Sequence, residues 1–141
     1  DSKLYVVNQE SVDCSFSMIK VSRLFEALGQ GKSIEEAIEA NKRDYEATKA
    51  LYPNKQILFS EVGWTTNCIA DKGMQKVEVT EENQAEYCKR LWDWTDKEKI
   101  TAFIFEAFDE PWKGSEKPDE AEKHWGLYYE DRTPKFIYQN K

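Results

Sequence analysis

The sequence predicts an α/β fold built on a parallel sheet, and three observations lead to this expectation. The clearest segments follow one another as helix, strand, helix and strand with short joins, which is the rhythm of βα units. The two strands, residues 56–60 and 101–105, are apolar enough to be buried on both faces, as parallel strands usually are. The 141 residues are enough for one domain with a sizeable core.

Each predicted helix has a recognisable start. Ser33 followed three positions later by Glu36 is a capping box, and apolar residues at helical spacing then predict an amphipathic helix from about Ser33 to Leu51. The second helix begins at Thr80, has acidic side chains in its first turn, where the helix dipole favours them, and ends near Glu98.

The remaining segments are less regular. Residues 4–8 and 16–21 are short β-prone runs, and the second could instead begin a helix. Residues 114–122 combine Gly, Ser, Pro and charged residues, which predicts a long loop. The chain opens with Asp1 and not with Met, which favours processing or truncation before this residue.

Charge and hydropathy exclude several classes of partner. The chain has 27 acidic and 20 basic side chains, a net charge of −7 and no basic patch, so it would repel the phosphates of nucleic acids and anionic membranes. Its longest apolar runs are far shorter than the roughly 20 residues that span a bilayer. We therefore expect neither a nucleic acid nor a membrane as a partner.

Cysteine and histidine usage argues against a metal site. Three cysteines without Cys-x-x-Cys spacing and one histidine leave a zinc site short of ligands, so we expect no metal and no cofactor. Cys68 and Cys88 could form a disulfide or be buried thiols, and the odd count leaves Cys14 unpaired. His124 is more typical of a loop histidine than of a general base.

Carboxylates follow both predicted strands. Glu61 ends the first, and Glu106, Asp109 and Glu110 follow the second. Because neighbouring parallel strands end at the same edge of a sheet, roughly 5 to 10 Å apart, these groups could face one another across a cleft. Such a pair suits the cleavage of glycosidic bonds. Binding of Ca²⁺ or Mg²⁺ by the three later acids is the weaker alternative, because the sequence lacks an Asp-x-Asp loop.

Aromatic residues accompany these carboxylates. The rings of Trp64, Trp112 and Trp125 could stack on the apolar face of a sugar, although most tryptophans serve the core. An isolated acid after a strand is commonly a helix cap or a surface charge. Spacing alone therefore does not decide between a catalytic and a structural role for Glu61.

Longer motifs are more specific. Residues 57–66, Ile-Leu-Phe-Ser-Glu-Val-Gly-Trp-Thr-Thr, closely resemble the strand-seven signature of glycoside hydrolase family 17, the β-1,3-glucanases and related glucanosyltransferases. That signature, Glu-x-Gly-Trp-Pro, carries the nucleophile, and Thr65 stands where the family usually has Pro. Residues 105–113 are similar to the strand-eight segment of the family, and its closing segment is matched by residues 124–128 and 132–136.

The resemblance implies a (β/α)8 TIM barrel that cleaves or rearranges β-1,3-glucan with retention. Because such a barrel needs about 250 residues, we expect the C-terminal portion of an incomplete barrel, its last two or three βα units. The chain would then be a single partial domain over residues 1–141, in which 24–138 are family-like and 1–23 match poorly.

The resemblance also assigns roles to single residues. Glu61 matches the nucleophile, while Glu110 and Lys113 match a strand-eight acid and lysine that help to organise the site. The positive charge of Lys113 could hold the nucleophile ionised. The other candidates for lining the substrate cleft are Trp64, Glu106 and Trp112.

The general acid is the weakest part of the match. The family has a Glu directly after Asn at the end of strand four, and Asn8-Gln9-Glu10 is only loosely similar, which makes Glu10 the candidate. Residues 22–25, Ser-Arg-Leu-Phe, stand where strand six should carry a His-Pro or Tyr-Pro element. A nucleophile without its acid would be slow, because positioned proton transfer contributes about 10² to 10⁴-fold.

The leading hypothesis is a β-1,3-glucan hydrolase or transglycosylase, extracellular or associated with a cell wall, that acts on cell-wall or storage glucan. It would be active if another segment or chain supplies the missing strands, and association is expected because exposed sheet edges favour it. The alternative is a non-catalytic glucan-binding or structural subunit derived from such an enzyme. An unrelated small α/β domain is a third, weaker hypothesis.

Overall fold

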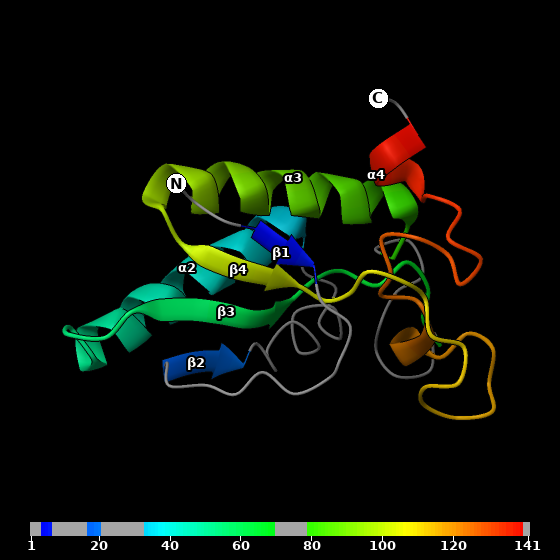
Figure 1. Ribbon diagram of the computed structural model, residues 1–141, viewed down its shortest axis with the longest axis horizontal. Coiled ribbons are helices and arrows are strands. Elements are labelled where there is room, and N and C mark those ends of the chain that lie inside the picture. The colour runs from blue at the N-terminus through cyan, green and yellow to red at the C-terminus, as the bar shows by residue number, and fades with distance from the viewer. Residues whose placement is uncertain (1–3, 7–16, 21–32, 70–78, 140–141) are drawn as a thin grey trace.

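The computed structural model describes residues 4–6, 17–20, 33–69 and 79–139. The predicted α/β order is confirmed, and the two N-terminal runs are both strands (Figure 1). The elements, in chain order, are β1 (Leu4–Val6), β2 (Ser17–Lys20), α2 (Ile34–Leu51), β3 (Ile57–Val62), α3 (Glu81–Glu98), β4 (Thr101–Ile104), η3 (Ala121–Lys123) and α4 (Phe136–Gln139).

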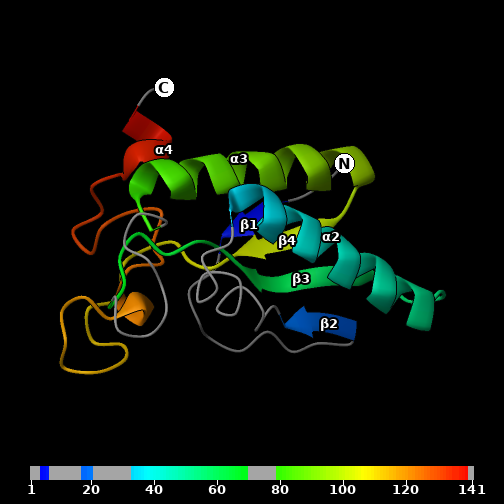
Figure 2. The same cartoon turned by 180° about the vertical axis from the view of Figure 1, so that it is seen from behind.

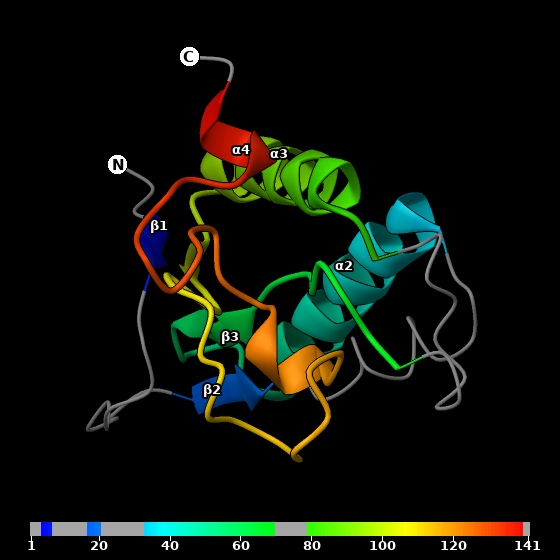
Figure 3. The same cartoon turned by 90° about the vertical axis from the view of Figure 1, so that its right-hand side faces the viewer.

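The strands form one parallel sheet in the order β1-β4-β3-β2. Helices α2 and α3 cover the same face of this sheet, as the view from behind shows (Figure 2). Figure 3 looks onto the carboxyl ends of the strands, where the segments that follow β3 and β4 gather. None of the described helices is long and apolar enough to cross a membrane.

Both long helices begin at the predicted caps. The Ser33 side chain accepts a hydrogen bond from the amide of Glu36, whose carboxylate accepts one from the Ser33 amide at 2.9 Å. The Thr80 hydroxyl accepts a hydrogen bond from the Asn83 amide at 3.1 Å, and α3 ends at Lys99 in the left-handed conformation. Side-chain oxygens thus satisfy amides that a helix start leaves without partners.

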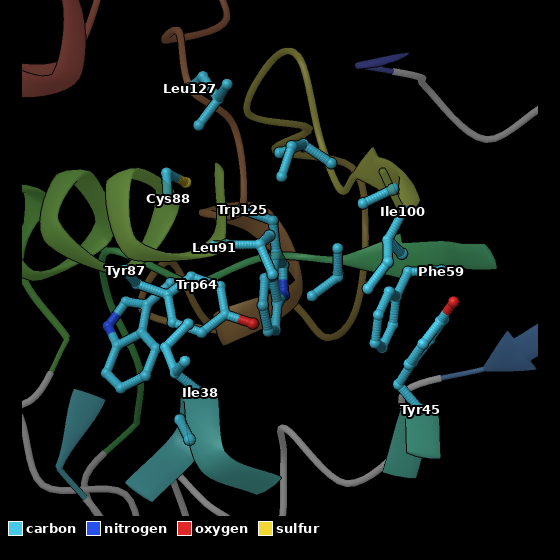
Figure 4. Packing of buried hydrophobic residues seen from close by; sticks show 14 of the residues in the cluster. Ile38, Tyr45, Phe59, Trp64, Tyr87, Cys88, Leu91, Ile100, Trp125 and Leu127 are labelled. Carbon is cyan, nitrogen blue, oxygen red and sulfur yellow. The ribbon is translucent and has the colours of Figure 1, made fainter. Parts of the chain in front are cut away.

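The core lies between the two helices and the sheet, and aromatic residues dominate it (Figure 4). At one end, Tyr45 stacks on Phe59 with ring centroids 6.1 Å apart, and Trp94 meets both rings edge-on. At the other end, Trp64 packs on Tyr87 with centroids 5.2 Å apart. These contacts fix both long helices against β3 and the residues that follow it.

The cysteines of the core are thiols. Cys68 and Cys88 are both buried and no disulfide joins them. Burial raises the pKa of Cys88 to about 12, so its side chain stays protonated and packs as a small apolar group. Of the two alternatives left by the sequence, the structure has buried thiols; Cys14 lies outside the described residues.

Strand β3 carries one residue more than either of its neighbours. On the β2 side, Phe59 pairs with Ile19, and Glu61 pairs with the very next residue of β2. On the β4 side, Phe59 and Val62 pair with Ala102 and with the residue two positions after it. The extra residue is a β-bulge at positions 60–61, seen from both sides.

The bulge changes the face to which Glu61 belongs. In a regular strand, residues two apart share a face, so Glu61 would lie on the helix-covered face with Ile57 and Phe59. With one residue inserted, Val62 takes that place and is part of the core cluster, whereas Ser60 and Glu61 are not. Glu61 is therefore directed away from the helices.

The ends of β3 and β4 approach each other closely after the bulge. The Phe105 amide donates to the Val62 carbonyl at 3.0 Å. A Cβ atom on Gly63 would lie 1.9 Å from the Phe105 carbonyl oxygen, so only glycine fits at this position. The Glu-x-Gly-Trp motif thus has a steric reason for its glycine.

A buried glutamine holds the segments that follow these two strands. The Nε2 atom of Gln84, on α3, donates to the carbonyls of Trp64 at 2.8 Å, Gly126 at 3.0 Å and Trp125 at 3.3 Å. Gln84 is 1% exposed. One side chain of α3 therefore joins the segment after β3 to residues 125–126, which follow β4.

We predict that Gln84→Leu lowers the free energy of unfolding by about 2 to 4 kcal/mol, because three buried carbonyls lose a donor. Urea denaturation followed by circular dichroism measures the change. Lys89→Leu, at an exposed position in the middle of the same helix, should stay within about 0.5 kcal/mol. Equal stability of the two variants would contradict the role given to Gln84.

Candidate active site

The candidate nucleophile lies at the carboxyl end of β3. Glu61 is half-buried and, as the bulge dictates, on the face opposite the helices. Within the described part of the chain, no hydrogen bond or ion pair engages its carboxylate. Glu61 is thus a carboxylate at the carboxyl end of the sheet that makes no polar contact holding the described residues together.

The acids that follow β4 hold a lysine between them. Lys113 Nζ lies 2.7 Å from Glu106 Oε2, also forms an ion pair with Glu110, and sits 4.5 Å from the centre of the Phe105 ring. The side chains of Glu106, Glu110 and Lys113 are 0%, 10% and 16% exposed. We call these three residues the Glu106 unit.

Burial and charge set the protonation of this unit. Burial raises the pKa of Glu106 to about 7, which Lys113 opposes and Glu110 reinforces. Burial lowers the pKa of Lys113, but its hydrogen bonds to Glu106 and Glu110 outweigh that effect, so the net shift is upward. Lys113 is therefore a fixed cation at neutral pH.

The expectation that Glu106 lines the cleft needs correction. Its side chain has no exposed surface, so it cannot touch a glucan in this structure. The ammonium of Lys113 also occupies the place between Glu106 and Glu110 that a metal ion would need. Across the described ranges, no three His, Cys, Asp or Glu side chains converge as metal ligands would.

A second buried lysine engages the third acid. Lys135 Nζ donates to Asp109 Oδ1 at 2.7 Å, to Thr66 Oγ1 at 2.8 Å and to the His124 carbonyl at 3.4 Å. The Gly126 amide also donates to Asp109 Oδ1, at 2.9 Å. Asp109 thus ties the segment after β3 to the segments after β4. Sequence reasoning had no role for Lys135, which lies 26 positions away from Asp109.

His124 belongs to the same network. Its Nδ1 lies 3.9 Å from Asp109 Oδ2, and its Nε2 lies 2.7 Å from the Pro118 carbonyl oxygen. The nearby carboxylate of Asp109 raises the pKa of His124 above its ordinary value, and the Pro118 carbonyl adds to the effect. Both ring nitrogens therefore serve to hold loops together.

The tryptophans divide between core and surface. Trp64 is 1% exposed and Trp125 4% exposed, so neither ring offers a face to a sugar in this structure, contrary to the expectation for Trp64. Trp112 is 69% exposed. Of the candidate aromatic platforms, only Trp112 is presented to solvent.

Trp112 borders a groove of about 890 Å³ that the sequence did not predict. The segments after β4 line it, and its walls include Asp109, His124 and Tyr129. The predicted loop at residues 114–122 contributes to it, and its Gly and Pro content is the signal that could have pointed there. Glu61 is not among its lining residues, so the groove adjoins the strand ends and does not cover the candidate nucleophile.

Glu10, the candidate general acid, lies outside the described residues, as do residues 22–25. In the described part, Glu61 lies at the carboxyl end of β3, and the Glu106 unit and Trp112 follow β4, the neighbouring strand. This part offers one fixed ammonium, one exposed indole ring and one carboxylate that no described residue engages.

We predict that Lys135→Met lowers the free energy of unfolding by about 3 to 5 kcal/mol, because Asp109 is left with a buried and uncompensated charge. Urea denaturation measures the loss. Lys97→Met, whose side chain is 81% exposed, should change stability by less than about 0.5 kcal/mol. Adding Asp109→Leu to Lys135→Met should recover part of the loss, and a further loss would argue against a charge effect.

Comparison with known proteins agrees with this architecture. The family model of the BtgE/BtgC glycoside hydrolase domain matches residues 13–126. The glucan 1,3-beta-glucosidase of Arthroderma benhamiae is 33% identical in an alignment of 125 positions that covers 78% of this chain and 39% of that protein.

Solved structures extend the comparison to the fold. The Rhizomucor miehei beta-1,3-glucanosyltransferase of glycoside hydrolase family 17 superposes with a TM-score of 0.70 at 24% identity, over 86% of this chain and 41% of that one. An endo-laminarinase from Formosa has a TM-score of 0.62 at 28% identity, over 84% and 30%. This chain thus spans about two fifths or less of the length of these relatives. The resemblance to family 17 is confirmed, and the chain belongs to the BtgE/BtgC glycoside hydrolase domain family.

Proposed function

We propose that the chain contributes the nucleophile of a retaining β-1,3-glucan hydrolase or transglycosylase, and that Glu61 is this nucleophile. The observation that carries the proposal is the bulge in β3, which directs Glu61 away from the helices while Phe59 and Val62 stay in the core. A strand that served only the core would need no such irregularity, and bulges are frequent beside active sites.

The names of the relatives support the choice of substrate. They are a glucan 1,3-beta-glucosidase, an endo-laminarinase and a beta-1,3-glucanosyltransferase, an active-site mutant of which was solved in complex with laminaritriose. We therefore propose a β-1,3-linked glucan of a cell wall or a storage polymer as the substrate. An extracellular or cell-wall location follows from that choice.

The proposed reaction has two steps. Glu61, ionised, attacks the anomeric carbon while an acid protonates the departing oxygen, and a glycosyl-enzyme ester forms. Water or a sugar hydroxyl then attacks the same carbon, Glu61 leaves, and the second carboxylate accepts the proton. Water as the acceptor gives hydrolysis and a sugar gives transfer.

The general acid completes this scheme, and we propose Glu10 for it. A retaining mechanism needs about 5 to 5.5 Å between the two carboxyl groups, and this distance is the criterion that Glu10 has to meet. In the proposed architecture, the chain forms the last βα units of a (β/α)8 barrel as one partial domain. The remaining strands, and the acid if Glu10 does not serve, come from another segment or chain.

The alternative is a glucan-binding subunit without catalysis. The exposed ring of Trp112 beside a groove favours binding irrespective of catalysis, because an indole face can pack on the apolar face of a sugar. The two functions differ in what happens to bound laminarin, so experiments can separate them.

We predict that Glu61→Gln lowers laminarin cleavage by more than about 10²-fold with an unchanged fold, because an amide cannot form the glycosyl ester. Release of reducing sugar and chromatography of laminarioligosaccharide products measure hydrolysis and transfer. Glu46→Gln, at an exposed position of α2, is the matched control and should keep full activity. Equal rates for the two variants would remove Glu61 from the reaction.

We predict that Trp112→Ala weakens laminarin binding about 5-fold, which corresponds to the loss of roughly 1 kcal/mol of aromatic contact. Isothermal titration calorimetry on the Glu61→Gln background measures binding without turnover. Tyr52→Ala, a 50% exposed aromatic at the opposite end of the sheet, should bind as the parent does. Binding lost by Trp112→Ala in a protein that never cleaves laminarin would favour the non-catalytic alternative.

A further inference from the structure

We propose that Glu106 is a positioning residue, which fixes the Lys113 ammonium against Glu110 and shares a proton with Glu110, without contacting the glucan itself. The proposal rests on the proposed function for its consequence in catalysis. Its structural content concerns only how the three side chains of the Glu106 unit hold one another.

Glu106 is held by hydrogen bonds of both its backbone and its side chain. Its amide donates to the Trp125 carbonyl at 3.2 Å, and its own carbonyl accepts from the Leu127 amide at 3.0 Å. Its side chain is fully buried, and Oε2 accepts from Lys113 at 2.7 Å. Backbone and side chain are therefore both fixed, and the lysine is held by a carboxyl group that cannot move into the cleft.

Glu106 and Glu110 share one proton. Oε1 of Glu106 is buried and accepts no hydrogen bond from any described N–H or O–H group, and its Oε2 shares the Lys113 ammonium with the carboxylate of Glu110. Two ionised carboxylates on one ammonium would leave a negative charge uncompensated beside the buried Oε1, so one carboxyl group of the pair carries a proton. Burial favours the neutral form of Glu106, whose ordinary pKa is raised to about 7.

The net charge of the Glu106 unit depends on this proton. With the shared proton in place, Lys113 and one carboxylate cancel, and the unit is neutral. When the proton leaves, the unit carries one negative charge, and the positive charge of Lys113 is compensated twice. Beyond Lys113 and Glu110, the charged group that senses Glu106 is Lys135, through a weaker and more distant interaction.

Contacts through Phe105 connect the Glu106 unit to the end of β3, where Glu61 lies. Lys113 rests on the ring of Phe105, and the Phe105 amide bonds the carbonyl of Val62, the residue after Glu61. A displaced Lys113 would change the electrostatic potential at the end of β3 although Glu106 touches no substrate. A residue that acts through another should therefore alter kcat and its pH dependence, and leave KM nearly unchanged.

Two substitutions separate the placement of Lys113 from the proton on Glu106. Glu106→Ala releases Lys113, and we expect kcat for laminarin to fall about 10-fold or more, since a misplaced catalytic group can cost up to about 10²-fold, with KM within about 2-fold. Glu106→Gln keeps the shape and an oxygen for Lys113 but cannot ionise. In this variant the step near pH 7 that the parent shows in kcat/KM should be absent, and the activity plateau should extend to higher pH. A raised KM with unchanged kcat would overturn the proposal in favour of substrate contact.

A measurement without turnover makes the inference independent of the proposed function. In protein with ¹³C-labelled glutamate carboxyls, nuclear magnetic resonance should show one carboxyl that titrates near pH 7, absent from Glu106→Gln and retained in Glu46→Gln. If this signal is present in a protein that does not cleave laminarin, the proposed function fails and the Glu106 unit stands. If laminarin is cleaved and no such signal exists, the inference is overturned.

Discussion

The alternation of side chains along a strand is the constraint on which this site depends. A strand sends successive residues to opposite faces, so a regular β3 would direct Glu61, two residues after Phe59, to the helix-covered face. Strand β3 meets this constraint with one inserted residue, which both neighbouring strands register. Phe59 and Val62 remain in the core and Glu61 does not. Gly63, which packs against the Phe105 carbonyl, follows two residues later. A packing constraint and the candidate nucleophile thus lie within a few residues of each other.

The acids beyond β4 show that clustered carboxylates need not all be catalytic. Asp109 and Glu106 each hold a buried or partly buried lysine, Lys135 and Lys113. The first pair joins residues 26 positions apart, and the second joins residues seven positions apart. Burying such charges is costly unless they are paired and hydrogen-bonded, and both pairs meet that condition. The loops at the carboxyl ends of the strands are therefore held by ion pairs, while Glu61 has no such partner among the described residues.

Much of this arrangement could be predicted, and the failures have physical reasons. The helix starts at Ser33 and Thr80 are local signals, as are the apolar runs of β3 and β4, and all of them were confirmed. The bulge has no local signal, because it exists only in the pairing of β3 with strands distant in the sequence. Trp64 follows a strand end just as a cleft residue would, but its exposure depends on packing against Tyr87 of α3. Glu106 has no exposed surface whereas Glu110 is 8% exposed, a difference that no spacing reveals.

The pairing of β1 with β4 has a consequence for assembly. Leu4 and Val6 of β1 lie opposite Ala102 and Ile104, so the outer edge of β4 is occupied, and the sheet that the structure describes ends in β1 on one side and β2 on the other. A strand from elsewhere that sought β4 would have to displace β1 and would form much the same ladder of hydrogen bonds. The free energies of the two pairings are then similar, and the effective concentration of each strand decides whether β1 or the other strand pairs with β4. Completion of a larger sheet would then be a competition between strands and not a simple addition.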